Sequence, residues 1–290
     1  MFFNNVKTAV LLASMSALLL FMGNLFGGTA GLHIALIIAL VMNLISYFFS
    51  DKIVLKMYGA IPLDPQQYDW IYKIIEELRT NMNLPMPKLW LVQTPMANAF
   101  ATGRNPSHAS VAVTTGILQI LSKEELRGVL AHEMSHVQNR DILVSTVAAT
   151  LATAIGYLAN MLQHMAFWGS FSGNNDQKRG NPIIMVLVAI LMPIAATLIQ
   201  LAISRSREYL ADETGAHTCH DPLALASALQ KLQNHIPEAH LRNDDAARAS
   251  TAPLFIVHPF TANSWIALFS THPPMNERIA RLKAMNEKMF

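Results

Sequence analysis

Two long apolar runs near the N-terminus, Val6–Phe26 and Gly31–Ser50, constrain this chain more than any other feature of its sequence. Each is close to the roughly 20 residues that an α-helix needs to cross about 30 Å of hydrocarbon. The link between them, Gly27–Ala30, is short and uncharged. The first run exceeds a usual signal core and a second run follows at once, so we predict a retained signal anchor that forms a tight helical hairpin.

The composition points in the same direction. The chain is 52% hydrophobic and 14% charged, whereas an average soluble domain is about 25% charged. A net charge of +2 is too small to indicate a nucleic-acid partner. The single cysteine, Cys219, excludes an internal disulfide framework and fits a reducing compartment for the part outside the bilayer.

Two later apolar stretches predict a second hairpin. They are Ile142–Trp168, with a span over residues 142–166, and Ile183–Ile203. The expected fold is thus a mainly α membrane protein with four transmembrane helices, divided at residues 1–50, 51–141, 142–203 and 204–290. Basic residues near the span ends gather on the side of the N-terminus: Lys7, Lys52, Lys56, Arg140, Arg205 and Arg207. The positive-inside rule then places the N-terminus, both polar segments and the C-terminus in the cytoplasm.

The polar segments predict an α+β domain with a small β-sheet. Helical spacing of apolar residues marks Pro65–Met82 as a helix. Three short β-like segments follow, at Lys88–Val92, Ala97–Thr102 and Ala109–Thr114. Near the C-terminus, helices are expected from Asp221–Pro222 to about Asn234 and over Met275–Lys288.

A possible metal site lies in the segment AHEMSHVQ, residues 131–138. Ser122 and Glu125 form a capping box, so a helix should begin at Lys123 and run through this segment. On that helix His132 and His136 share one face and can hold one metal ion. Glu133 stays free to handle a proton, as the general base of zinc peptidases does.

The third ligand is expected from the segment SRSREYLADETG, residues 204–215. A membrane hairpin between His136 and Glu208 would return Glu208 to the depth of the first helix, and we assign Glu208 as the third zinc ligand. Asp212, one turn later on the same face, would hydrogen-bond a ligand imidazole. A solvated helix with charges of both signs is the alternative reading.

Other residues are weaker candidates for the site. Asp141 is expected to face away from the histidine pair and to fix the junction between helix and membrane. His217, Cys219 and His220 carry metal-binding atoms, but no second Cys–His cluster accompanies them. His272 is assigned to stabilise the tetrahedral intermediate, with a surface position as the alternative.

Taken in order, the motifs NAFATG, HEMSHVQNRD, SRSREYLADETGA and THPPMNERIARL, between two hairpins, resemble the HtpX family of membrane-bound zinc endopeptidases, relatives of the CAAX prenyl-protein proteases. The resemblance implies a zincin-like (gluzincin) domain with one Zn²⁺ per chain on His132, His136 and Glu208, and Glu133 as base and then proton donor. It also implies that Asn98, Ala99, Phe100 and Ala101 lie on an edge strand, where substrate pairs as an added β-strand.

The same resemblance implies a role in the bacterial inner membrane, namely the quality control of damaged membrane proteins under stress. Membrane-protein substrates and the lipid bilayer are the expected partners, without nucleic acid. Two other classes remain open. A membrane adaptor that keeps zinc for stability would lack chelator-sensitive proteolysis. A small transporter is disfavoured because the apolar spans contain no acidic residue.

Overall fold

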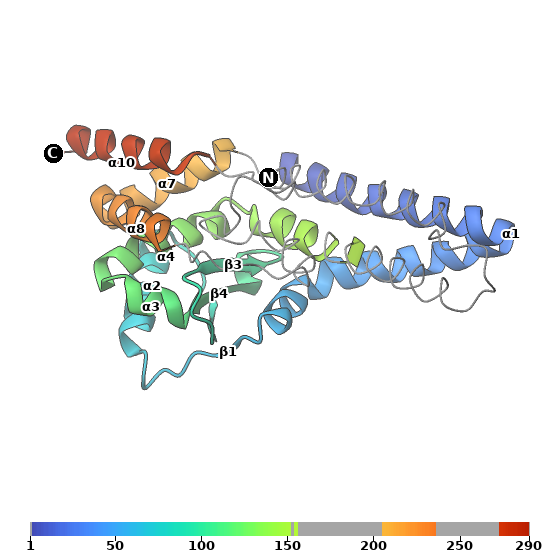
Figure 1. The fold of residues 1–290 in the computed structure, drawn as a ribbon, viewed down its shortest axis with the longest axis horizontal. Helices are drawn as coiled ribbons and strands as arrows, with labels where there is room; N and C mark the ends of the chain where they lie inside the picture. Colours follow the sequence, from blue (N-terminus) through green and yellow to red (C-terminus); the bar gives the residue numbers. More distant parts are fainter. Residues whose placement is uncertain (1, 152–153, 156–204, 236–272, 290) are drawn as a thin grey trace, which may run out of the picture.

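The computed structural model describes residues 2–151, 154–155, 205–235 and 273–289 (Figure 1). The predicted span Ile183–Ile203, most of the span 142–166, and His272 lie outside these residues.

The N-terminal helix α1, Phe2–Met57, contains a break at Gly28, whose φ of 56° and ψ of −141° are not helical. The break separates two apolar helices, Asn4–Leu25 and Gly27–Met57, that are long enough to cross a membrane. They run side by side in Figure 1, and a hydrogen bond of 2.8 Å from Asn43 Nδ2 to Ser16 Oγ joins them. The prediction of two apolar N-terminal helices is confirmed, and the described residues do not establish four.

A small mixed sheet follows, as the β-like segments predicted. Its strands are β1 (Ile61–Pro62), β2 (Lys88–Val92), β3 (Ala99–Gly103) and β4 (Ala109–Thr114). The strand order is β1-β2-β4-β3, with β2 parallel to β4 and the other pairs antiparallel. Strand β3 therefore lies at one edge of the sheet.

Both faces of β3 are covered, and alternate residues serve the two layers as expected for a strand. Ala99 and Ala101 belong to the main core, which includes helix α4, Lys123–Gln138. Phe100 packs on the other face against Val54 and Leu55 of α1. The apolar helix Ile142–Leu151 also contributes to that face, where Thr146 Oγ1 and Thr102 Oγ1 are 3.0 Å apart.

The remaining described helices pack on α4, on its neighbours or beside the sheet (Figure 1). They are α2 (Asp69–Asn81), α3 (Thr115–Ile120), α7 (Arg205–Cys219), α8 (Pro222–Asn234) and α10 (Met275–Met289), with the short 3₁₀ helix η1 at Pro106–His108. The start of α4 has the predicted capping box of Ser122 and Glu125. The Glu125 carboxylate also accepts hydrogen bonds from Ser227 and Lys231 of α8, which ties the two helices together.

Candidate metal centre

Helix α4 carries His132, Glu133 and His136 at the centre of the domain. His132 and Glu133 are buried, with 2% and 6% of their surface exposed. Most of α4 is buried although it contains several polar and charged residues. Burying a charged side chain without a partner costs free energy. These side chains must therefore find partners on other elements, and most of those partners come from α7 and β3.

Three potential ligand atoms meet above α4. His132 Nε2 lies 3.3 Å from His136 Nε2. Glu208, on α7, places its carboxylate oxygens 3.7 Å from His132 Nε2 and 3.6 Å from His136 Nε2. Ligands about 2.0–2.1 Å from a tetrahedral zinc ion are about 3.3–3.4 Å apart, so the donor set and its spacing fit such an ion. Within the described ranges, these three residues form the one group of this kind.

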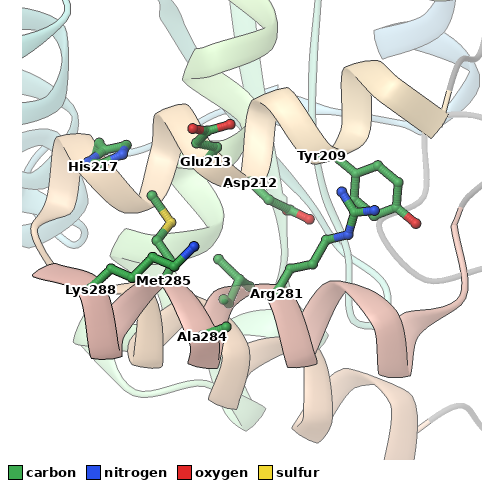
Figure 2. Close-up of a pocket in the computed structure, with 9 residues that line it drawn as sticks. Tyr209, Asp212, Glu213, His217, Arg281, Ala284, Met285 and Lys288 are labelled. Atoms are coloured by element: carbon green, nitrogen blue, oxygen red, sulfur yellow. The ribbon is translucent and has the colours of Figure 1, made fainter.

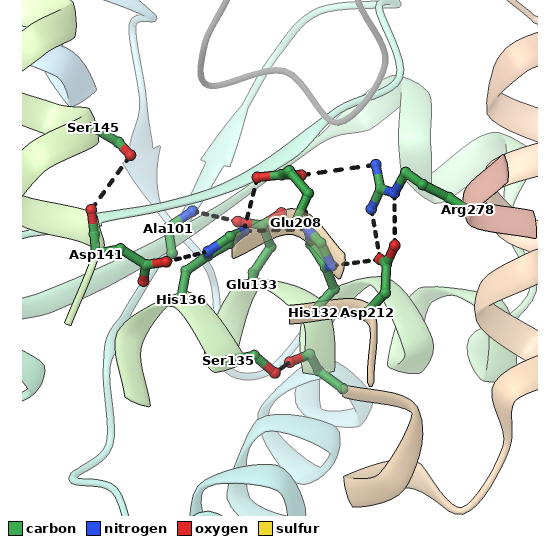
Figure 3. A network of polar contacts seen from close by, with 11 residues as sticks. Ala101, His132, Glu133, Ser135, His136, Asp141, Ser145, Glu208, Asp212 and Arg278 are labelled. Atoms are coloured by element: carbon green, nitrogen blue, oxygen red, sulfur yellow. Dashed lines mark hydrogen bonds and ion pairs between the residues drawn. The ribbon is translucent and has the colours of Figure 1, made fainter. Parts of the chain in front are cut away.

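Each histidine has a carboxylate behind its other ring nitrogen (Figure 3). Asp212 Oδ1 lies 2.9 Å from His132 Nδ1, and Asp141 Oδ2 lies 3.2 Å from His136 Nδ1. A proton held on Nδ1 by a carboxylate leaves the Nε2 lone pair free for a metal. Asp212 thus takes the position that the sequence predicted for it.

The expectation that Asp141 faces away from the histidines is wrong. Helix α4 ends at Gln138, and Arg140 adopts a left-handed conformation with φ of 57°. This residue turns the chain back, and the Asp141 amide donates a hydrogen bond of 3.2 Å to the His136 carbonyl. A helix continued through residue 141 would place Asp141 on the opposite side, but α4 ends at Gln138 and the turn brings this carboxylate to His136.

Arg278 on α10 is a component that the sequence argument missed. It has no exposed surface, and it donates hydrogen bonds from Nε and Nη2 to the two oxygens of Asp212, at 2.8 and 2.7 Å. Its Nη1 lies 3.9 Å from Glu208 Oε2. A signal was present in the sequence, because Arg278 falls on the apolar face of its helix, one turn before the buried Leu282.

Glu133 reaches the sheet rather than the histidine pair. Its Oε2 accepts a hydrogen bond of 2.9 Å from the backbone N–H of Ala101 on β3. Burial is the largest influence on Glu133 and raises its carboxyl pKa, although the two imidazoles oppose that effect. A carboxylate with a raised pKa, held beside a metal site, is suited to accept and return a proton.

The two ligand histidines bind protons strongly when no metal is present. Burial alone would lower the pKa of His136, but the carboxylates of Asp141, Glu208 and Glu133 outweigh burial and raise this pKa to about 10. The pKa of His132 is also raised, because hydrogen bonding to Asp212 and Glu208 outweighs its burial. The site is therefore rich in negative charge and prepared for a cation.

The predicted substrate-binding residues lie on or beside β3. Asn98 precedes the strand and is paired with β4, since its carbonyl accepts a 3.0 Å hydrogen bond from the Thr114 amide. Alternation along an antiparallel pair then directs the backbone groups of Ala99 and Ala101 to the free edge. The side chain of Phe100 is buried against Tyr58, with ring centroids 5.2 Å apart, so a segment added to this edge would meet mainly backbone.

Of the remaining candidates, those in the described segments are not brought into the site. His272 lies outside the described residues. In the described segments, Cys219 is buried and its thiol donates to the Arg127 carbonyl, while burial raises its pKa to about 11. His217 lines another pocket of about 450 Å³ between α7 and α10, which Asp212 also borders (Figure 2). In that pocket the Arg281 guanidinium lies 3.6 Å from the centroid of the Tyr209 ring.

Comparison with known proteins agrees with this geometry. Residues 65–286 match peptidase family M48. The chain is 53% identical over 280 residues to a protease HtpX homolog of Syntrophobacter fumaroxidans, covering 96% of this chain and 98% of the relative. It is 49% identical to a protease HtpX homolog of Aquifex aeolicus, covering 98% and 94%.

A solved structure shares the fold. The crystal structure of S. mikatae Ste24p aligns with a TM-score of 0.51 at 17% identity, over 96% of this chain and 65% of that one. This chain therefore spans about two thirds of the length of that protein. The family match, the relatives and the buried His–His–Glu cluster lead to one conclusion: the chain belongs to peptidase family M48 and is a metalloprotease.

Proposed function

We propose that this protein is a zinc-dependent endopeptidase of the bacterial inner membrane that cleaves cytoplasmic segments of damaged or misassembled membrane proteins. The observation that carries the proposal is the position of Glu133 between the ligand cluster and the backbone of edge strand β3. The two apolar helices of α1 support a membrane location. The names of the relatives support proteolysis, and the basic residues beside the spans support a cytoplasmic site.

The proposed chemistry uses His132, His136 and Glu208 to hold the ion. When bound, zinc would act as a Lewis acid toward the scissile carbonyl and would lower the pKa of a water molecule. Glu133 takes the proton from the attacking water and then gives it to the leaving amine. Asp212 and Asp141 keep the imidazoles oriented throughout.

Substrate is proposed to pair with β3 as an added strand. This edge offers the backbone groups of Ala99 and the carbonyl of Ala101, since the Ala101 N–H is bonded to Glu133. Backbone groups of this kind bind extended peptide with little demand on its sequence. The Ala101 N–H is the group that holds Glu133, so the base lies at the same edge as the substrate backbone. Little sequence preference suits an enzyme that removes damaged proteins.

The proposal is tested with the purified full-length protein and a single-span test protein that carries an unstructured cytoplasmic segment. We expect cleavage within that segment, its loss after treatment with a zinc chelator, and its recovery when Zn²⁺ is restored. A membrane adaptor that uses zinc for stability would bind the metal without cleaving. Cleavage that persists after the metal has been removed would contradict the proposal.

A further inference from the structure

The second apolar helix of α1 carries a band of exposed aromatic side chains, about two turns before its end at Met57. Tyr47, Phe48 and Phe49 are 39%, 46% and 49% exposed, and they follow a series of exposed aliphatic residues in the same helix. Lys52 comes one turn later. Aromatic residues that separate an apolar stretch from basic residues are typical of the boundary between hydrocarbon and headgroups, so this band marks one surface of the bilayer.

The helix continues beyond that boundary. Gly27–Met57 contains 31 residues, which corresponds to about 46 Å of helix, more than the ~30 Å of the hydrocarbon core. Its last turns pack on the sheet, where Val54 and Leu55 contact the cluster that contains Phe100. The sheet is thus held at a fixed distance from the aromatic band.

The connection between β3 and β4 returns to the level of the band. The Arg104 guanidinium lies 5.4 Å from the centroid of the Phe48 ring. Its Nη2 is 2.9 Å from His108 Nε2, and His108 Nδ1 is 2.8 Å from Asn105 Oδ1. The turn Gly103–His108 is therefore ordered by its own polar side chains and lies against the end of the apolar helix.

Two cations at this level have no acidic partner among the described residues. Lys52 shares the face of Phe48, four residues earlier, and its Nζ lies 5.2 Å from the centroid of the Phe49 ring. Neither Lys52 nor Arg104 takes part in an ion pair within the described segments. Cations placed beside exposed aromatic rings at a bilayer boundary match the phosphates of anionic lipids in charge and depth.

We propose that Lys52, Arg104 and His108 form a binding surface for anionic phospholipid headgroups, called here the headgroup surface. Arg104 supplies a planar fork that suits a phosphate, and Lys52 adds a second positive charge. His108 orients the guanidinium through its ring nitrogen. Binding of headgroups to this surface holds the β3–β4 turn on the membrane.

The headgroup surface also limits how far from the bilayer a substrate is cut. This inference rests on the proposed function. Strand β3 runs beside the end of α1, from Phe100 opposite Tyr58 to the turn where Arg104 meets Phe48. Ala101, which holds Glu133, is three residues from Arg104, or about 10 Å along an extended strand. A segment paired with β3 would therefore be cut within a few residues of the bilayer.

The first test measures depth without changing the proposed binding residues. A spin label is placed at Ser107→Cys in the full-length Glu133→Gln, Cys219→Ala protein, reconstituted in nanodiscs that contain phosphatidylglycerol. We expect strong relaxation of the label by a nickel chelate attached to lipid headgroups, and weak relaxation of a matched label at Lys73→Cys on α2. Equal, weak relaxation at both positions would overturn the proposal.

The second test asks whether the positive charges of Lys52 and Arg104 bind anionic lipid. Short-chain phosphatidylglycerol is titrated into the same catalytically inactive full-length protein in a zwitterionic detergent. We expect Lys52→Gln with Arg104→Gln to weaken binding about tenfold or more, and Lys73→Gln to leave it unchanged. Unchanged binding by the double variant, or equal affinity for inorganic phosphate, would overturn the assignment to lipid. Neither measurement involves cleavage, so failure here is distinct from failure of the proposed protease function.

Discussion

Each ligand histidine is oriented by a carboxylate from a different part of the chain. Asp141 follows the same helix through a left-handed turn, and Asp212 comes from α7. Arg278 neutralises part of this charge from the last helix and holds the pKa of Asp212 below its usual value, despite burial that would raise it. The result is a cluster that keeps a net preference for a cation without placing isolated charges in the core.

Metal binding should strengthen as pH rises from about 6 to 8. In the metal-free protein both ligand imidazoles have raised pKa values, about 10 for His136, so protons compete with the metal below those values. Each proton released on binding gives up to about a tenfold gain in affinity per pH unit. Competition with a chromophoric chelator measures the slope. The variant Asp141→Asn removes the main group that raises the pKa of His136, so zinc affinity should depend less steeply on pH in this variant. A zinc affinity that does not change with pH in the unmodified protein would contradict this electrostatic description.

Arg278 should support metal binding and turnover by positioning Asp212. The substitution Arg278→Leu leaves a buried carboxylate without its partner, and loss of such supporting contacts costs about 10–100-fold in metal affinity or activity. Arg278→Lys should recover part of that loss, since it restores the charge without the bidentate geometry. Chelator competition and the cleavage rate of the test protein measure the two effects.

A matched control lies on the same helix. Arg281 is exposed and pairs with Glu277 on its own helix, so Arg281→Gln should keep both metal affinity and turnover. Equal losses in the Arg278→Leu and Arg281→Gln variants would mean that a general disturbance of α10, rather than contact with Asp212, causes the effect.

At the scale of elements, the site depends on the close approach of α4 and α7. Gly215 makes that approach possible, since a Cβ at this position would lie 2.9 Å from the His132 amide nitrogen and 3.1 Å from the Ala131 carbonyl carbon. Both obstacles are backbone atoms, which cannot move aside as a flexible side chain does. The position of Glu208 relative to the histidines therefore follows from a residue two turns along the same helix.

The substitution Gly215→Ala should separate α7 from α4. We expect a loss of about 1–3 kcal/mol in stability from overpacking, and weaker metal binding because Glu208 moves with its helix. Thermal unfolding in detergent and zinc content of the purified protein measure the two effects. Gly27→Ala is the control, because a Cβ there meets nothing within 4 Å; an equal effect of both substitutions would contradict the packing argument.

Several elements could be predicted from local patterns, and others could not. The bounds of β2 and β4 and the start of α4 match the sequence expectations, because alternation and a capping box are local signals. Helix α2 begins at Asp69 instead of Pro65, since the Asp64 carboxylate accepts a hydrogen bond from the Gln66 amide and forms a turn first. Strand β1 has only two residues, too few to carry a periodic signal.

At the scale of the whole molecule, motif spacing alone predicted only that His132 and His136 share a site. The choice of Glu208 as third ligand needed the additional argument from the membrane hairpin, and the structure groups Glu208 with the two histidines. The role of Arg278 was not predictable in the same way, because it depends on how α10 packs against α7 across many intervening residues. The headgroup surface is likewise a product of tertiary placement, with Lys52 and Arg104 brought to one level by the fold.

The central claim is that His132, His136 and Glu208 bind one zinc ion while Glu133 handles the proton. The most direct measurement compares zinc content and cleavage rate for the full-length Glu133→Gln and Glu208→Gln proteins. We predict that Glu133→Gln keeps about one zinc per chain, with cleavage reduced about 10²–10⁴-fold, and that Glu208→Gln loses both zinc and cleavage. Cleavage by Glu133→Gln at the unmodified rate, or a full zinc complement in Glu208→Gln, would contradict the claim.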